Sequence, residues 1–296
     1  MRIVIGGASG FLGRAWRDHL AGEGHEVIRL VRRQPGTPTE SRWDPDAGHV
    51  DPEVIEAADV VACLSGAPLL HVPWNAGYQR TFTDSRVRPT RTLAEAVARS
   101  SRRPALVVQN GVAGYAGHGD LVRTEESDTD ADTFMAGVTR EWQQATEPAG
   151  RAGARVAVMR TGVVLGKHGG AFAPMSLAFR AGLGGPMGSG DQYFPTISLT
   201  DWVRAATYLA AHDSCTGAYN LTGPATTTNK EFAHTLGALL HRPAVLRVPS
   251  PVIRLGLGAA ASEVLGSARV EPARLLDEGF TFEDATLEDR LRSALS

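Results

Sequence analysis

The chain contains little lysine and little cysteine, and its charges nearly balance. Of its 30 basic residues only Lys167 and Lys230 are lysines, and 32 acidic residues bring the net charge to −2. A nucleic-acid-binding protein would show a strongly basic face or domain, so we expect no nucleic-acid partner. The two cysteines, Cys63 and Cys215, are too few for a disulfide framework and lack the spacing of metal ligands.

Long apolar stretches are also missing. No run reaches the 18 apolar residues of a membrane span, and the opening Met-Arg-Ile-Val-Ile stretch is too short for a signal peptide. We therefore expect no membrane association and a cytoplasmic location. Hydrophobic residues still make up 43% of the 296, which is enough for a sizeable core, and this length predicts about two domains.

The expected elements alternate between strands and helices. Strands are expected at residues 2–5, 25–31, 59–64, 105–108 and 155–160, and helices at residues 12–23, 84–100 and 134–149. This alternation predicts an α/β fold, a doubly wound Rossmann-type parallel sheet covered by helices on both faces.

The texture of the sequence changes after residue 165, where glycines become frequent. We assign residues 1–165 to the Rossmann domain and residues 166–296 to a substrate-side region, with a small C-terminal domain from about residue 245. Later elements are a helix at 200–211 capped by Thr200, a strand at 218–222, and a helix opened by the capping box Thr228-Asn229-Lys230-Glu231. Strands near residues 195–225 could rejoin the first sheet.

A glycine-rich loop follows the first strand and opens the first helix. Gly7-x-x-Gly10-x-x-Gly13 has the spacing of a dinucleotide-binding loop. There the first glycine permits the tight turn, the second lets the backbone approach a pyrophosphate, and the third allows close helix–strand packing. We expect this loop, with Phe11 and Leu12, to hold the phosphates at the helix N-terminus. The alternative is a glycine-rich turn without a ligand.

The end of the second strand indicates which cofactor binds. NAD-binding proteins usually place Asp or Glu there to hold the ribose 2′-hydroxyl, whereas this chain has Val31-Arg32-Arg33. A guanidinium matches a 2′-phosphate in charge and in geometry. Arg32 and Arg33 therefore predict NADP(H) rather than NAD. The alternative is an arginine pair on a solvated edge.

Taken with further motifs, these residues resemble the extended branch of the short-chain dehydrogenase/reductase superfamily. The narrower resemblance is to atypical epimerase-family proteins that carry a small C-terminal domain of their own. The matching segments span nearly the whole chain and include GGASGFLG (6–13), LSGAP (64–68), SRVRPTRTL (85–93), RTGVVLG (160–166), AGLGGPMGSGDQYFP (181–195) and the tail ending in RLLDEGFTFED.

The resemblance implies cofactor contacts beyond the glycine loop. Leu64 and Ser65 would flank the cofactor at the third strand–helix crossing, Arg86 would contact cofactor or substrate, and Val164 would touch the nicotinamide side. Arg86 could instead form a salt bridge on a helix surface, and Val164 could be ordinary core.

The superfamily's usual catalytic motif, Tyr-x-x-x-Lys, is absent from the sequence. Its lysine lies one helix turn from the tyrosine and lowers the tyrosine pKa. Here the residues four positions before the two lysines are Val163 and Thr226. The matching helix reads Phe134-Met135-Ala136-Gly137-Val138, and the strand end that normally offers Ser or Thr reads Asn110-Gly111.

Other groups are therefore candidates for proton transfer. Tyr115, just past the strand that ends at Gly111, is the first candidate, with a packed loop aromatic as the alternative. The remaining candidates are Glu125, His118, Ser198 and Asp201, although first-turn electrostatics explain Asp201 better and His118 reads as a solvated loop residue.

Two functions are consistent with these patterns. The first is an NADP(H)-dependent oxidoreductase or epimerase-like enzyme that acts on a small polar or sugar-like molecule, as a monomer or a homodimer. The second, favoured by the missing Tyr-x-x-x-Lys motif, is an NADP(H)-binding sensor or interaction protein without turnover. A purely structural module would require the glycine loop to be incidental.

Overall fold

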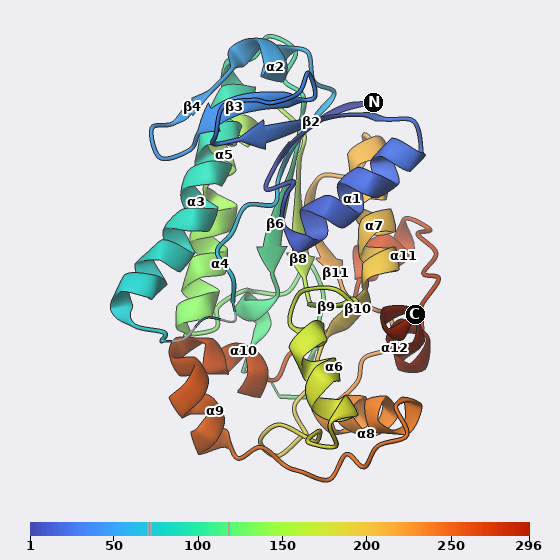
Figure 1. Cartoon of the computed structure of the whole chain (residues 1–296). Coiled ribbons are helices and arrows are strands. Elements are labelled where there is room, and N and C mark those ends of the chain that lie inside the picture. Colours follow the sequence, from blue (N-terminus) through green and yellow to red (C-terminus); the bar gives the residue numbers. More distant parts are fainter. Residues whose placement is uncertain (70, 72, 118) are drawn as a thin grey trace.

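The computed structural model describes residues 1–69, 71, 73–117 and 119–296. Within these residues an eight-stranded sheet has the order β11-β8-β6-β5-β1-β2-β3-β4 (Figure 1). Its strands are β1 (Arg2–Gly6), β2 (Glu26–Val31), β3 (Glu40–Asp44), β4 (His49–Val50), β5 (Val60–Cys63), β6 (Ala105–Gly111), β8 (Val156–Thr161) and β11 (Gly217–Leu221). Neighbouring strands are parallel, except that β4 is antiparallel to β3.

The strand order makes β1 and β5 neighbours at the centre of the sheet. The chain runs outward from β1 to β4 on one side and from β5 to β11 on the other, so its direction of travel reverses between β1 and β5. Open α/β sheets bind ligands at the carboxyl ends of the strands beside such a switch point. The predicted Rossmann-type fold is confirmed, and the glycine loop leaves β1 at this place.

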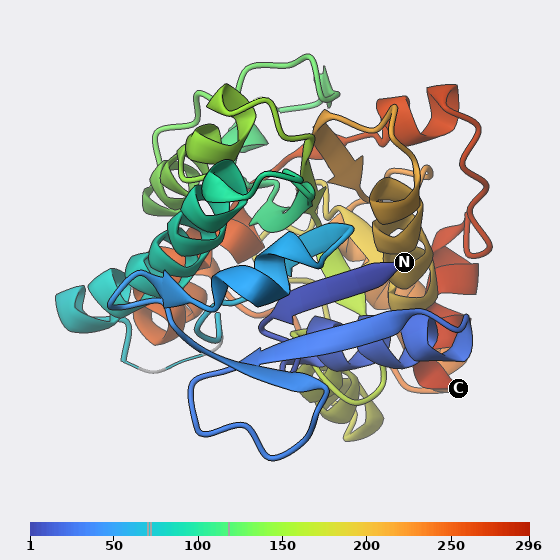
Figure 2. The ribbon, with the colours of Figure 1, turned by 90° about the horizontal axis from the view of Figure 1, so that it is seen from above.

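Helices cover both faces of the sheet, as Figures 1 and 2 show. The helices α1 (Phe11–Gly22) and α7 (Leu199–Ala211) pack on one face, and α3 (Ala76–Arg99), α4 (Phe134–Gln144) and α5 (Glu147–Arg151) pack on the other. The short α2 (Pro52–Glu56) precedes β5. Both faces are buried because side chains alternate along each strand, so Ile3 and Ile5 enter one core while Val4 enters the other.

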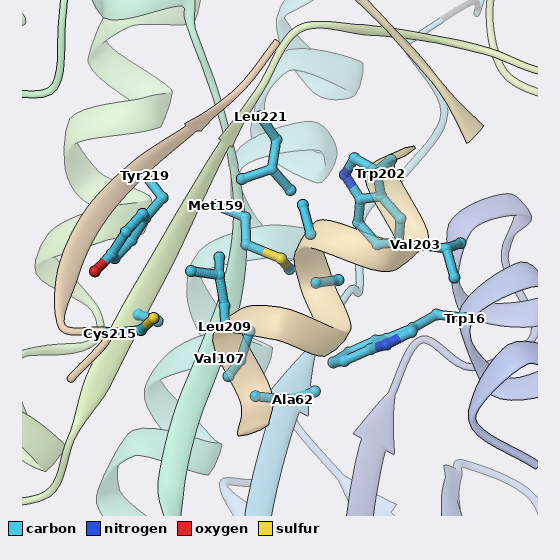
Figure 3. Packing of buried hydrophobic residues seen from close by; sticks show 14 of the residues in the cluster. Trp16, Ala62, Val107, Met159, Trp202, Val203, Leu209, Cys215, Tyr219 and Leu221 are labelled. Carbon is cyan, nitrogen blue, oxygen red and sulfur yellow. The ribbon is translucent and has the colours of Figure 1, made fainter. Parts of the chain in front are cut away.

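The core under α1 and α7 centres on two tryptophans. Trp16 of α1 and Trp202 of α7 meet edge to face with ring centroids 6.3 Å apart, and neither is exposed. Figure 3 shows both rings in the same core as Ala62, Val107 and Met159, which come from the neighbouring strands β5, β6 and β8. An edge-to-face pair adds about 0.5–1.5 kcal/mol to the area that it buries. This contact fixes α7 against α1, beside the glycine loop.

The region after β8 builds a second, smaller core. It is formed by α6 (Phe172–Arg180), α8 (Asn229–Leu239) and α12 (Leu287–Leu295), with β9 (Val163–Leu165) beside β10 (Thr196–Ser198). The remaining described elements are η1 (Ala113–Tyr115), β7 (Val122–Arg123), α9 (Ser250–Leu257), η2 (Gly258–Ala260), α10 (Ala261–Leu265), β12 (Arg269–Val270) and α11 (Ala273–Asp277). β11 pairs with β8, so a strand beyond residue 165 does rejoin the first sheet.

Several predicted boundaries were wrong for identifiable reasons. Asn75 caps α3, so this helix begins eight residues before the predicted start and continues through the buried Pro89. Ser198, not Thr200, caps α7 by accepting a hydrogen bond from the Asp201 amide at 3.1 Å. The predicted helix over 134–149 is two helices, because Pro148 occupies the first turn of α5 and cannot donate to the preceding turn.

Other predictions were confirmed. The capping box at Thr228 and Glu231 opens α8 with both reciprocal hydrogen bonds.

The strands β3 and β4 were not predicted, because their mixed polar sequence lacks a clear two-residue period. Across the described ranges, no helix combines the length and the apolar character needed to cross a bilayer.

Candidate functional site

The glycine loop is shaped so that side chains cannot be added to it. Gly7 has φ +86°, and a Cβ there would lie 2.6 Å from the carbonyl carbon of Leu64 and 2.7 Å from the amide nitrogen of Ser65. A Cβ on Gly13 would overlap the carbonyl oxygen of Gly7. Backbone therefore approaches backbone at both positions, which only glycine permits. The loops after β1 and β5 come together at the switch point as a result.

The start of α1 leaves its amides available to a ligand. Gly10 is the N-cap with an extended backbone, no side chain caps the helix, and its first turn contains no acidic residue. The Gly10 amide donates to the Gly7 carbonyl at 3.0 Å, which closes the turn. Free N–H groups and the helix dipole together favour an anion here.

Phe11 and Leu12 reach this place mainly through their backbone. The ring of Phe11 packs under the loop that follows β9, where a Cβ on Gly166 would lie 2.7 Å from it. Leu12 packs against the core under α1 and α7. Their side chains fix the helix start, while their amides belong to the first turn. Contact of either residue with a cofactor stays a prediction.

A cavity of about 580 Å³ lies on another side of Phe11, and no glycine of the cofactor loop lines it. Its wall includes His168 and Lys167, whose ammonium donates to the carbonyl of the terminal residue, Ser296, at 2.7 Å. Lys167 therefore binds the C-terminal residue and not a catalytic tyrosine.

The loop after β5 is held by α3. The Ala67 amide donates to the Ser85 hydroxyl at 2.8 Å, and Arg86 Nη2 donates to the Ala67 carbonyl at 3.0 Å. The Arg86 guanidinium also lies over the Phe82 ring, 3.4 Å from its centroid. These contacts make Arg86 a positioning residue for the Leu64–Ala67 loop. Its predicted contact with cofactor or substrate stays a prediction.

Val164 belongs to the core in this structure. It pairs with Ile197 in the β9–β10 ladder and is buried in the cluster under α1 and α7. Its side chain therefore has the packing role that sequence analysis held as the alternative. The predicted contact with the nicotinamide side stays a prediction.

The two arginines after β2 have different environments. Arg33 donates two hydrogen bonds to the Glu40 carboxylate, at 2.9 and 2.6 Å, and Arg29 pairs with the same carboxylate at 2.9 Å. The hydrogen bond from Arg33, together with one from the Gly36 amide, lowers the pKa of Glu40 to about 2. Arg32 is exposed, and the described part of the chain offers it no hydrogen-bond or ion-pair partner.

The structure corrects the expectation that no carboxylate is available at the end of β2. A carboxylate does lie near the tip of β2, because Glu40 enters from β3 in register with Arg29. Two guanidiniums neutralise it, so it does not act as the acidic residue of an NAD site. Arg33 is engaged by Glu40, which leaves Arg32 as the guanidinium available to a 2′-phosphate.

Tyr115 is fully buried in η1, away from solvent. Its hydroxyl donates to Asn220 Oδ1 at 3.2 Å and accepts a hydrogen bond from Arg160 Nη1. Burial raises the pKa of Tyr115, although Arg160 opposes the shift. A catalytic tyrosine needs access and a lowered pKa, so this geometry favours the packed-aromatic alternative over the predicted catalytic role.

The other proton-transfer candidates also have structural partners. Glu125 is buried, accepts hydrogen bonds from the amides of Asn220 and Arg274, and has a pKa raised by burial. Asp201 is fully buried and accepts hydrogen bonds from two amides of the C-terminal segment, and Ser198 caps α7. His118 lies outside the described residues. No group of His, Cys, Asp and Glu suited to a metal ion occurs among the described residues.

An aromatic wall, which sequence analysis missed, occupies the space between α3 and the start of α4. Trp74, Tyr78 and Phe82 pack with Phe134 and Met135, and ring centroids of Trp74 and Phe134 are 6.2 Å apart. The four-residue spacing of the first three was a signal that could have revealed it. The start of α4, where the resemblance would place the Tyr-x-x-x-Lys motif, is therefore apolar.

Comparison with protein families and known proteins is consistent with this geometry. Residues 3–222 match the NAD dependent epimerase/dehydratase family, and residues 248–294 match a domain of unknown function. An epimerase family protein of Mycobacterium bovis is 37% identical over 290 residues, covering 98% of this chain and 96% of the relative. The mouse epimerase family protein SDR39U1 is 37% identical over 304 residues, covering both chains completely.

Solved structures give the same relationship. The human epimerase family protein SDR39U1, crystallised with NADPH, superposes with a TM-score of 0.91 at 34% identity, covering 100% of this chain and 99% of that one. A nucleoside-diphosphate sugar epimerase from Corynebacterium glutamicum has a TM-score of 0.81 at 31% identity, where this chain matches 58% of the longer protein. The chain belongs to the NAD dependent epimerase/dehydratase family, and its residues 248–294 form a match to a separate domain of unknown function.

Proposed function

We propose that this protein binds NADP(H) at the switch point and acts as an oxidoreductase or epimerase-like enzyme on a small polar or sugar-like molecule. The observation that supports it most is a glycine cradle together with an arginine after β2, Arg32, that has no hydrogen-bond or ion-pair partner among the described residues. Gly7 and Gly13 admit no Cβ, and Arg32 is exposed while its neighbour in sequence, Arg33, is paired with Glu40. The same cofactor in the human relative supports the assignment.

The residues divide the binding of the cofactor between them. The amides at the start of α1 would hold the pyrophosphate, and Arg32 would hold the adenosine 2′-phosphate. The Leu64–Ser65 backbone, kept in place by Arg86, would border the ribose side. When bound, the nicotinamide supplies hydride transfer to or from a substrate carbon. The chain itself would orient the cofactor through these backbone and guanidinium contacts.

Ligand-induced stabilisation tests the cofactor assignment. NADPH at a hundredfold excess over its dissociation constant should raise the unfolding free energy by about 2.7 kcal/mol, and NADH at equal concentration should do less. Gly7→Ala places a Cβ against the Leu64 carbonyl and should abolish the effect of both. An NADH shift equal to or above the NADPH shift contradicts the assignment.

A second function, an NADP(H)-binding sensor without turnover, is favoured by a specific observation. Tyr115 is buried, and Phe134 and Val138, which stand where the motif's tyrosine and lysine would be, pack in an apolar cluster. Absorbance of NADPH followed against carbonyl compounds and nucleotide sugars separates the two functions. Turnover above the blank supports the enzyme, whereas tight binding without turnover across the panel supports the sensor.

A further inference from the structure

A second cavity, of about 360 Å³, lies beside α4 and outside the proposed cofactor crevice. It shares no residue with the glycine loop, the tip of β2 or the Leu64–Ala67 loop. Every lining residue is polar or glycine, which is unusual because ligand pockets are mostly apolar. The residues that matter for its chemistry are Asn110, Thr139, Arg140, Gln143 and Arg160.

Arg160 brings a buried positive charge to this cavity. It is 8% exposed, and it donates from Nη1 to the Tyr115 hydroxyl and from Nε and Nη2 to Gln143 Oε1. Both partners are neutral, and these bonds use three of the five N–H donors of a guanidinium. A buried charge without a counter-charge is costly, so an anion in the cavity would stabilise it.

Arg140 supplies a second guanidinium from α4. Its Nη1 donates to the carbonyls of Thr129 and Ala131, at 2.9 and 3.0 Å, which fixes the segment that brings Thr129 to the cavity wall. Among the described residues, no carboxylate forms an ion pair with Arg140 or Arg160. The one acidic residue of the wall, Glu147, pairs with Arg151 of α5. The cavity is therefore positively charged.

We propose that this cavity binds a small hydrophilic molecule through an oxyanion, a phosphate or a carboxylate group, held by Arg160 and Arg140. The volume lies near the lower limit of ligand pockets, which suits a compact molecule. The amide and hydroxyl groups of the wall would bind its remaining polar atoms. Guanidinium pairs recognise both anions through charge-assisted hydrogen bonds.

This inference is tested by thermal unfolding of the full chain in the presence of inorganic phosphate or of succinate, the carboxylate probe. The ionic strength is held constant with chloride. We expect saturable stabilisation by at least one probe. Arg140→Gln should weaken that probe's affinity about tenfold or more, because it removes a charge-assisted partner. Arg99→Gln, which removes an exposed arginine of α3 that pairs with Glu95, is the matched control and should leave it unchanged.

Hydrogen exchange on the unmodified protein gives a second readout that needs no variant. The saturating probe should protect the amides of Gly111 and Thr129, which line the cavity, and should leave the α1 amides unchanged. Stabilisation that is equal in wild type, Arg140→Gln and Arg99→Gln overturns the proposal as a general salt effect. Absence of any saturable effect with both probes overturns it as well. Neither outcome bears on NADPH binding, which is measured separately.

Discussion

The free guanidinium at Arg32 provides the sharpest test of the cofactor site. Arg32→Ala removes the guanidinium after β2 that, unlike Arg33, forms no ion pair with a described residue. A hydrogen bond to a charged group contributes about 1.5–3 kcal/mol, so NADPH affinity should fall about tenfold to 150-fold. NADH lacks the 2′-phosphate, so its affinity should stay within about twofold.

Arg33→Ala is the informative companion variant. The Arg33 guanidinium is already bonded to Glu40, so its loss should reduce NADPH affinity much less than loss of Arg32. Isothermal titration of NADPH and NADH into wild type and both variants measures each effect, and Arg102→Ala, which removes an exposed arginine paired with Asp59 before β5, is the control. If Arg33→Ala weakens NADPH binding as much as Arg32→Ala, the reasoning from the Glu40 ion pair is refuted.

Three further predictions concern stability. Gly223→Ala places a Cβ into the guanidinium of the buried Arg290, so it should lower the free energy of unfolding, measured in urea, by about 2–4 kcal/mol. Gly22→Ala has open space around it and should change that free energy by less than about 1 kcal/mol. Because the pKa of Glu40 is lowered from 4.5 to about 2, its stabilisation is complete above about pH 4.5 and is lost as the pH falls toward 2. Glu40→Gln should flatten that part of the stability curve, and an unchanged acid dependence would contradict the assignment. Tyr115→Phe should lower stability by about 1–2 kcal/mol and leave NADPH affinity unchanged; loss of turnover with full stability would instead make Tyr115 catalytic.

The cofactor loop was predictable because its requirements are local. Gly7, Gly10 and Gly13 lie within seven residues, and their spacing indicates that the loop needs a positive φ and a close approach of backbone to backbone. The same holds for the capping box at Thr228, which was confirmed, since its two partners are three residues apart. Contacts at such short separation depend little on the rest of the fold.

The partner of Arg33 was not predictable in this way. Glu40 reaches the tip of β2 only because β3 pairs in parallel with β2, and nothing in the polar stretch around residue 40 indicates a strand. The environment of Tyr115 was not predictable either, because its hydrogen-bond partners Arg160 and Asn220 are 45 and 105 residues away in the sequence.

Sequence alone determined the alternation of strands and helices, the glycine loop and the absence of Tyr-x-x-x-Lys, because these depend on residue type and short-range order. Tertiary structure decided which arginine is free, that Tyr115 is enclosed, and that Arg160 and Arg140 line one polar cavity. The physical reason is that charge pairing and burial depend on which distant segments the sheet brings together, and strand register sets these contacts only after the chain has folded.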